Sequence, residues 1–187
     1  MNLKYIITDF DGTLVDTVYA NVAAYRDAFN ECDCEFSELL YSKAFGLKFD
    51  DMCDILGVPR DKSLRDDIRS KKREFYNRYF NLINVNAQLL SFISTIKENN
   101  PEVKTAIAST ASKDNLYAVL RFFGIENDWD VIVTGDDVSF GKPNPEVYNI
   151  TKNRLGVKDD NEVIVFEDTE IGCKAAYDAG IKNVIKL

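Results

Sequence analysis

The sequence predicts an α/β fold: a parallel five-stranded sheet covered by helices on both faces and interrupted once by a helical insertion. The first observation is a set of strand-like apolar runs at residues 3–9, 103–108, 131–133, 162–166 and 182–186. From the second run onward these alternate with helical patterns, which is typical of a parallel sheet wrapped by helices. The second observation is that residues 17–83 break the alternation and are helix-like throughout.

The helices of the alternating part follow from apolar faces and end signals. The segment 86–98 and the helical pattern after it each carry one apolar face. The second of these helices should end at Gly124, because glycine readily adopts the left-handed conformation of a helix C-cap. Asn144 and Pro145 are predicted to be the N-cap and first position of the next helix. A fourth helix follows Thr169, and its alanines suit close packing on the sheet.

The insertion contains at least two helices. Apolar residues recur at helical spacing in its first part (Val18, Val22, Tyr25 and Phe29) and in its second part (Leu64, Ile68, Phe75 and Tyr79). We therefore predict a catalytic core formed by residues 1–16 and 84–187, and a helical cap formed by residues 17–83. Inserted directly after the first strand, the cap is expected to lie over the strand ends like a lid.

Composition excludes several classes of function. The 187 residues include no histidine, which removes Ser-His-Asp and Cys-His catalysis and the usual zinc sites. A net charge of −8 argues against nucleic acid as a partner, because its binding depends on basic surfaces. No apolar run approaches the roughly 18 residues of a membrane helix. The start of the chain shows no signal-peptide pattern, so we expect no membrane association and a cytoplasmic location.

Two aspartates follow the first predicted strand. Side chains at i and i+2 of an extended segment point the same way, and Gly12 allows a sharp turn directly after them. Asp9 and Asp11 can therefore converge on one small ligand. For an isolated DxDG motif, local hydrogen bonding of both aspartates to the backbone would be the better interpretation.

Three further segments carry chemically matching residues. Ser109 and Thr110 end the second strand just before a helix, where hydroxyls and free amides can hold phosphate, although both residue types are also ordinary helix caps. Lys142 lies in a turn stiffened by two prolines, where a solvated lysine is the plain alternative. Glu167 and Asp168 end the fourth strand. The carboxyl ends of parallel strands form the usual ligand-binding edge, so these residues are expected to meet Asp9 and Asp11 there.

Four segments together resemble a known family. DFDGTLVDT, AIAST, GKPNPEVY and VIVFEDTEIGCKAAYDAGI, in this order and spacing, are similar to the four motifs of the haloacid dehalogenase superfamily of phosphotransferases. The similarity is strongest to the branch with a helical cap between the first two motifs, which includes phosphoglycolate phosphatases and β-phosphoglucomutases. The resemblance covers essentially the whole chain and implies a doubly wound, Rossmann-like sheet. Members of this family usually continue beyond the position of Leu187 through another loop and helix.

The resemblance implies a role for each motif residue. Asp9 would be the nucleophile that forms an aspartyl-phosphate, and Asp11 the general acid and base. Ser109 would bind the phosphoryl group with the amides that follow it, and Lys142 would offset the charge of that group. Among residues near the substrate, the resemblance places Gly12, Thr13 and Thr110 in the core. In the cap it places Lys48, within a candidate specificity turn Gly46-Leu47-Lys48, where an exposed lysine with no role in binding is an equally good interpretation.

The resemblance also implies a Mg²⁺ site. Asp9, Asp168 and the backbone carbonyl of Asp11 would hold the ion, with Glu167 nearby through water. Electrostatics independently favours a cation, because several carboxylates and a phosphate dianion around one lysine would repel each other severely. Oxygen ligands favour Mg²⁺ over zinc or copper.

The sequence is compatible with three functions, which follow from the most to the least favoured. The first is a phosphatase that acts on a small phosphorylated metabolite of the phosphoglycolate or sugar-phosphate type, since Asp11 supplies a proton donor aimed at a leaving oxygen. The second is a sugar-phosphate mutase. Such mutases carry a histidine near the position of Asn21, which this chain lacks. The third is a non-catalytic interaction protein, disfavoured because no motif residue is substituted. A monomer is expected, with a dimer as the alternative.

Overall fold

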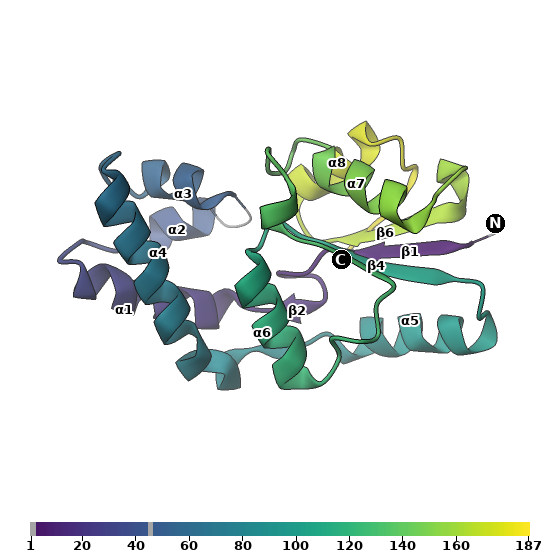
Figure 1. The fold of residues 1–187 in the computed structure, drawn as a ribbon, viewed down its shortest axis with the longest axis horizontal. Helices are drawn as coiled ribbons and strands as arrows, with labels where there is room; N and C mark the ends of the chain where they lie inside the picture. The colour runs from purple at the N-terminus through teal and green to yellow at the C-terminus, as the bar shows by residue number, and fades with distance from the viewer. Residues whose placement is uncertain (1–2, 45–46) are drawn as a thin grey trace. The chain divides into compact units, whose positions relative to one another are not determined.

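A computed structural model of the protein describes residues 3–44 and 47–187 (Figure 1). The chain divides into two compact units. The core unit consists of Met1–Asp16 together with Val85–Leu187, and the helical unit consists of Thr17–Asn84. No helix within the two described ranges is long and apolar enough to cross a membrane.

The core unit is built on a parallel sheet in the order β5-β4-β1-β6-β7. Its strands are β1 (Tyr5–Thr8), β4 (Lys104–Ala108), β5 (Val131–Val133), β6 (Val163–Glu167) and β7 (Asn183–Lys186). Strand β1 lies at the centre, and Ile7 pairs with Ala106 of β4 on one side and Val165 of β6 on the other. Because β1 has a strand on each side and helices on both faces, its two consecutive isoleucines, Ile6 and Ile7, are both fully buried. The five predicted strands and the parallel α/β fold are confirmed.

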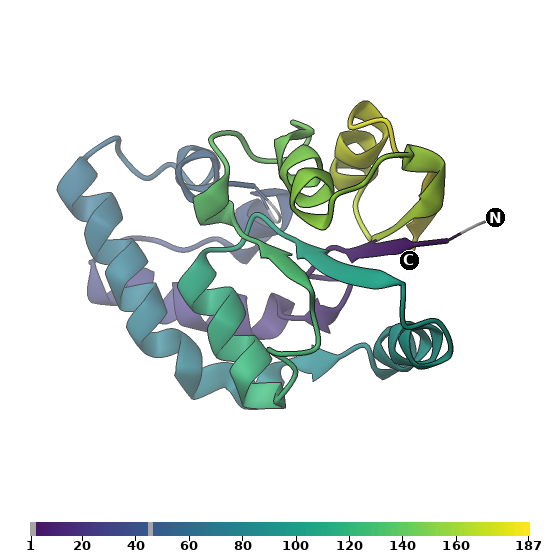
Figure 2. The same cartoon turned by 45° about the vertical axis from the view of Figure 1, so that its right-hand side comes forward.

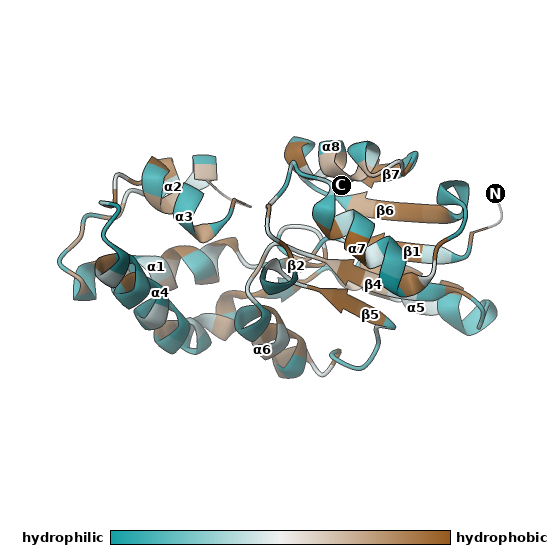
Figure 3. Ribbon diagram, turned by 45° about the horizontal axis from the view of Figure 1, so that its top comes forward, coloured by the Kyte–Doolittle hydropathy of each residue, from teal (hydrophilic) through white to brown (hydrophobic). Residues whose placement is uncertain are grey.

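Helices cover both faces of this sheet. Figure 2 shows α7 (Glu146–Leu155) and α8 (Glu170–Asp178) on one face, and α5 (Ala87–Asn99) and α6 (Lys113–Phe123) on the other. Strands β4, β5 and β6 are strongly hydrophobic, and the helices alternate between hydrophilic and hydrophobic residues (Figure 3). Short 3₁₀ helices, η2 (Gly135–Asp137) and η3 (Asp160–Glu162), precede α7 and β6. The two-residue strands β2 (Val15–Asp16) and β3 (Asn84–Val85) pair with each other, which the sequence pattern did not predict.

Alternation along the strands divides the core residues between the two faces. Ile7 packs into a fully buried cluster with Tyr148 of α7 and Ala175 and Ala176 of α8. The small side chains of α8 permit close packing on the sheet, as predicted from the sequence. Ile6 is also fully buried, and its side chain points to the opposite face because neighbouring side chains alternate across a strand.

The helix ends match the sequence with one correction. Gly124 ends α6 in the left-handed conformation with φ +69°, and Thr169 caps α8 by accepting a hydrogen bond from the Gly172 amide. The predicted start of α7 is wrong by one residue, because Pro145 occupies the N-cap and the helix begins at Glu146. Asn144 still stabilises this start, since its Oδ1 accepts a hydrogen bond of 3.0 Å from the Glu146 amide.

The helical unit contains α1 (Val18–Glu31), α2 (Glu38–Ala44), α3 (Phe49–Ile55), α4 (Lys62–Tyr76) and the 3₁₀ helix η1 (Asn77–Leu82). Helix α1 packs mainly against α4. The helix predicted from the spacing of Val18, Val22, Tyr25 and Phe29 is confirmed. Its fully buried residues are Ala20, Ala24, Ala28 and Phe29, and Val22 and Tyr25 are partly buried against the same cluster as Phe29. Small residues on the packed face let the two helix backbones approach closely, and the larger residues lie at its margin.

Candidate active site

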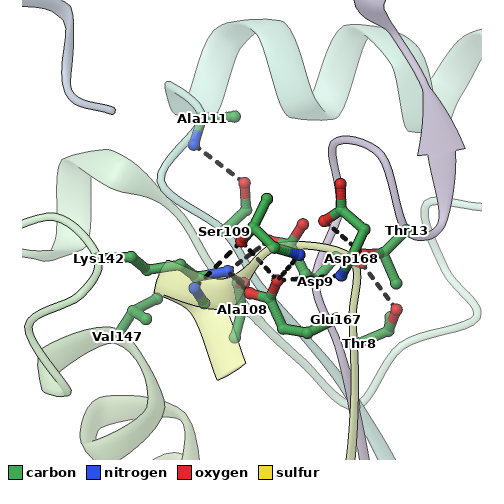
Figure 4. A network of polar contacts seen from close by, with 12 residues as sticks. Thr8, Asp9, Thr13, Ala108, Ser109, Ala111, Lys142, Val147, Glu167 and Asp168 are labelled. Atoms are coloured by element: carbon green, nitrogen blue, oxygen red, sulfur yellow. Dashed lines mark hydrogen bonds and ion pairs between the residues drawn. The ribbon is translucent and has the colours of Figure 1, made fainter. Parts of the chain in front are cut away.

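The carboxyl ends of three adjacent strands bring the candidate residues together (Figure 4). Asp9 follows the central strand β1, and its amide donates a hydrogen bond of 2.9 Å to Phe166 O. Ser109 follows β4, and its amide donates to Val133 O of β5 at 3.0 Å. Glu167 is the last residue of β6, and Asp168 comes directly after it. The backbone of the sheet thus positions all of these side chains at one edge.

Lys142 is buried between two carboxylates. Its Nζ donates to Asp9 Oδ1 at 2.6 Å, to Ala108 O at 3.3 Å and to Glu167 Oε1. An ammonium group has three N–H donors, so these three acceptors satisfy it completely. Lys142 and Asp9 are each only 6% exposed, which makes this a desolvated ion pair. The Lys142–Pro143 peptide bond is cis.

Glu167 is fully buried, and hydrogen bonds satisfy both of its oxygens. Oε1 accepts from Lys142 and from the Tyr148 hydroxyl, the latter at 2.7 Å. Oε2 accepts from the amides of Asp168 and Thr169 at 3.2 and 3.3 Å, and from the Thr169 hydroxyl at 3.1 Å. This carboxylate therefore orients Lys142. The sequence analysis did not identify Tyr148 or Thr169 as residues of the site, although both lie inside the third and fourth motifs.

The turn after β1 is fitted around Asp168. Thr13 is buried, and its hydroxyl donates to Asp168 Oδ1 at 3.1 Å. Gly12 has φ +88°, and a Cβ atom at this position would overlap the Asp168 carboxylate. Glycine is thus required both for the turn and for the approach of Asp168. Asn86 supports the same turn, since its Nδ2 donates to Thr13 O at 3.1 Å, and its N-cap position before α5 was the only sequence signal for it.

The loop after β4 holds the second motif. Ser109 is buried, and its Oγ accepts a hydrogen bond of 2.9 Å from the Ala111 amide. The Gly135 amide donates to Ala111 O at 2.7 Å, and a Cβ atom at Gly135 would overlap the Thr110 carbonyl. The backbone of this loop is therefore packed directly against Gly135. Thr110 is half-buried beside Ser109.

Burial and charge shift the acidities of the site. Burial raises the pKa of Asp9 to about 8, although Lys142 acts in the opposite direction. Burial and the Glu167 charge also raise the pKa of Asp168. Burial would raise the pKa of Glu167 too, but Lys142 and the Tyr148 hydroxyl hold it below its usual value. Burial by itself would lower the pKa of Lys142, but Asp9, Tyr148 and Glu167 keep that pKa well above its usual value.

The donor set fits a hard divalent cation. One oxygen from each of Asp9, Glu167 and Asp168 lies within 4.8 Å of the other two. The Lys142 ammonium pairs with two of these three carboxylates, Asp9 and Glu167, so the cluster carries excess negative charge that a cation would offset. All of the ligand atoms are oxygens, as Mg²⁺ prefers. Asp11 is partly exposed, and its charge contributes to the raised pKa of Asp9, which places it beside the cluster.

Lys48 belongs to the helical unit. It is half-buried at the N-cap position of α3 with extended backbone angles. Gly46, the first residue of the proposed specificity turn, lies outside the described residues. A role for Lys48 in substrate binding stays a prediction.

Comparisons with known proteins agree with this geometry. Residues 6–186 match the family model described as haloacid dehalogenase-like hydrolase. The chain is 29% identical to the phosphorylated carbohydrates phosphatase of Thermotoga maritima, over 97% of this chain and 84% of that protein. It is also 29% identical to the pyrophosphatase PpaX of Bacillus velezensis, over 95% of this chain and 80% of that protein. A solved hydrolase from Pseudomonas syringae superposes with a TM-score of 0.83 and 25% identity, covering 96% of this chain and 82% of that one. With nearly its whole length matched by the family model and the four motifs gathered at one sheet edge, the chain belongs to the haloacid dehalogenase-like hydrolases.

Proposed function

We propose that the protein is a Mg²⁺-dependent phosphatase that hydrolyses a small phosphorylated metabolite through an aspartyl-phosphate on Asp9. The observation that carries this proposal is the buried Asp9 carboxylate at the end of the central strand, 2.6 Å from Lys142 Nζ and within the group of three carboxylates. A nucleophile, a fixed positive charge and an oxygen-rich cation site then share one desolvated position. This combination suits phosphoryl transfer, in which positioning and charge stabilisation supply most of the acceleration.

In the first step an Asp9 carboxylate oxygen attacks the phosphorus atom of the substrate. The bond from phosphorus to the leaving oxygen breaks as the new oxygen–phosphorus bond forms, and Asp11 donates a proton to the departing oxygen. Lys142 and the Ser109 hydroxyl offset the charge of the transferring group. Lys142 can do so without reorganisation because Asp9, Glu167 and Ala108 already hold its ammonium.

In the second step water attacks the phosphorus atom of the acyl phosphate. Asp11, now ionised, accepts the proton of this water, and the Asp9–phosphorus bond breaks to release inorganic phosphate. Both residues return to their starting states, so one phosphate is released for each substrate consumed. Partial exposure suits Asp11 to this exchange of protons, because it must meet both substrate and water.

Mg²⁺ would be held by the side chains of Asp9 and Asp168 and by the backbone carbonyl of Asp11, with Glu167 nearby through water. When bound, it would supply positive charge that lets a phosphate dianion approach the carboxylates. The Thr13 hydroxyl already holds Asp168 in position, and Gly12 leaves room for its carboxylate. Both oxygens of Glu167 already accept hydrogen bonds, from Lys142, Tyr148 and Thr169. Glu167 therefore suits an indirect contact with the ion, through water.

The family and its relatives support the proposed substrate class. The similarity to a phosphatase of phosphorylated carbohydrates and to a pyrophosphatase supports a small phosphorylated metabolite, without distinguishing among sugar phosphates, phosphoglycolate and pyrophosphate. We assign residues 17–83 as the cap that selects the leaving group, with Lys48 as its candidate cationic contact.

Phosphate release from a generic aryl phosphate tests the proposal. Release should require Mg²⁺ and stop in excess EDTA. Asp9→Asn should lower kcat by about a thousandfold or more, since loss of a covalent nucleophile costs several orders of magnitude. Asp178→Asn is the matched control, because that carboxylate of α8 is exposed and its ion pair in the described structure is with Lys174 on the same helix. Undiminished turnover in EDTA, or an Asp9→Asn enzyme with a tenth of wild-type activity, would refute the mechanism.

The mutase alternative has its own test. A mutase must protect its aspartyl-phosphate from water, and Asn21 replaces the histidine expected there, with its Nδ2 donating to Thr17 Oγ1 at 3.0 Å. Incubation with β-glucose 1-phosphate and a trace of the 1,6-bisphosphate, followed by phosphorus NMR, should show free phosphate. Glucose 6-phosphate that accumulates faster than free phosphate would favour the mutase. An absence of any turnover would favour the interaction protein.

A further inference from the structure

We propose that Tyr148 is a positioning residue of this site: its hydroxyl fixes the Glu167 carboxylate and thereby the direction in which Lys142 presents its ammonium. The proposal rests on the proposed function, because it assigns Lys142 to charge stabilisation. Tyr148 lies in the first turn of α7, six residues after Lys142, and is fully buried.

The hydrogen bonds at Glu167 Oε1 carry the argument. This oxygen accepts from both Lys142 and the Tyr148 hydroxyl, whereas Oε2 accepts, within the described part of the chain, from Asp168 and Thr169. Tyr148 thus shares its acceptor atom with the catalytic ammonium. A fixed Oε1 gives Lys142 one defined direction, in which its other bonds reach Asp9 at 2.6 Å and Ala108 O at 3.3 Å.

Packing alone does not explain a tyrosine at this position. Its ring lies in the apolar cluster with Ala106, Val133 and Val165, where phenylalanine would fill the same space. Burying a hydroxyl is costly unless it is hydrogen-bonded, and this one donates to the carboxylate at 2.7 Å. The ring has a separate contact, since its centroid lies 5.2 Å from Lys142 Nζ. Tyr148→Phe therefore keeps the ring contact and removes only the bond to Glu167.

The chain offers a matched control in the same helix. Thr151 is also fully buried, one turn further along α7, and its hydroxyl donates to Val147 O at 2.7 Å. Thr151→Val removes a buried hydroxyl of α7 without touching Glu167. A purely structural effect of losing such a hydroxyl should appear in both variants.

The kinetic test uses the full-length enzyme, Mg²⁺ and an aryl phosphate well below the unfolding temperature of each variant. Tyr148→Phe should lower kcat about tenfold, the effect of one hydrogen bond to a charged group, with KM changed less than about twofold. Thr151→Val should leave both constants unchanged. In a Glu167→Gln background, adding Tyr148→Phe should cost less than about twofold in kcat, because the charged acceptor is already gone. Equal losses in both backgrounds would overturn the proposal.

A second readout does not depend on turnover. In protein labelled with ¹⁵N-lysine, the ammonium signal of Lys142 is identified by its disappearance in Lys142→Arg. Tyr148→Phe should shift this signal and speed its hydrogen exchange, and Thr151→Val should do neither. An unmoved signal overturns the positioning role, whatever the kinetics show. A shifted Lys142 signal with unchanged kcat would show that this positioning does not matter for catalysis, and would overturn the proposal as well. If the wild-type protein shows no turnover, the proposed function fails separately.

Discussion

Substitution of Gly172 by alanine should destabilise the core unit although it places a better helix former in α8. A Cβ atom built at Gly172 overlaps the carboxylate of Glu167. A flexible side chain could move away at little cost, but Glu167 is 0% exposed and receives hydrogen bonds at both oxygens. Its displacement must therefore strain or break the contacts to Lys142 and Tyr148.

The expected magnitude follows from two opposing effects. Replacing glycine by alanine inside a helix stabilises by about 1 kcal/mol. Displacing Glu167 weakens two hydrogen bonds at a buried charge, for a loss of about 3 kcal/mol in total. The free energy of unfolding should thus fall by about 2 kcal/mol, which lowers the unfolding temperature by roughly 4–8 °C for a protein of this size.

The chain's single tryptophan makes the measurement specific to the core unit. Trp129 lies in this unit and is 9% exposed, so its fluorescence during denaturant unfolding reports on the core rather than on the helices. The rescue variant is Glu167→Asp with Gly172→Ala, because the shorter side chain withdraws from the new methyl group. In the Glu167→Asp background, Gly172→Ala should be neutral or stabilising. Gly172→Ala at least as stable as the wild type would refute the overlap.

Three further results are expected. Thr13→Val removes the hydroxyl bonded to Asp168, so half-maximal activation should need at least about tenfold more Mg²⁺, as titration of activity would show, while Thr151→Val should need no more. Asp11→Ala should let an activated phosphoryl donor label Asp9 but slow the breakdown of the label; peptide mapping that located the phosphate elsewhere would contradict this. Hydrogen bonds from Arg60 and Arg65 lower the pKa of Asp54 to about 2 from 3.8. The stabilisation that they supply is complete above pH 3.8 and lost as the pH falls through about 2. As the pH is lowered over this range, the helical circular dichroism signal of the wild type should therefore decrease more steeply than that of Asp54→Asn. Equal slopes of signal against pH would count against the Asp54 interaction.

The sequence determined the elements and the edge at which chemistry occurs. Apolar runs of strand length alternate with amphipathic helices, and polar residues follow directly after three of those runs. Parallel strands bring their carboxyl ends to one edge, so Asp9, Ser109 and Asp168 had to lie at that edge if the runs paired as predicted. Local signals such as Gly124 after α6 also needed no tertiary information, because a left-handed cap depends on the residue itself.

Only the tertiary structure decided which side chains meet. Lys142 and Asp9 are 133 residues apart and Thr13 and Asp168 are 155 apart, so their contacts depend on strand order and register, which periodicity does not encode. The roles of Tyr148 and Asn86 were hidden for the same reason, since an apolar helix face and an N-cap explain them locally. Which residues of α1 are fully buried, Ala24 but not Val22, likewise depends on the packing of this helix against α4. The local pattern determines the secondary structure from which a side chain projects. The packing of segments distant in sequence determines which other side chains it contacts.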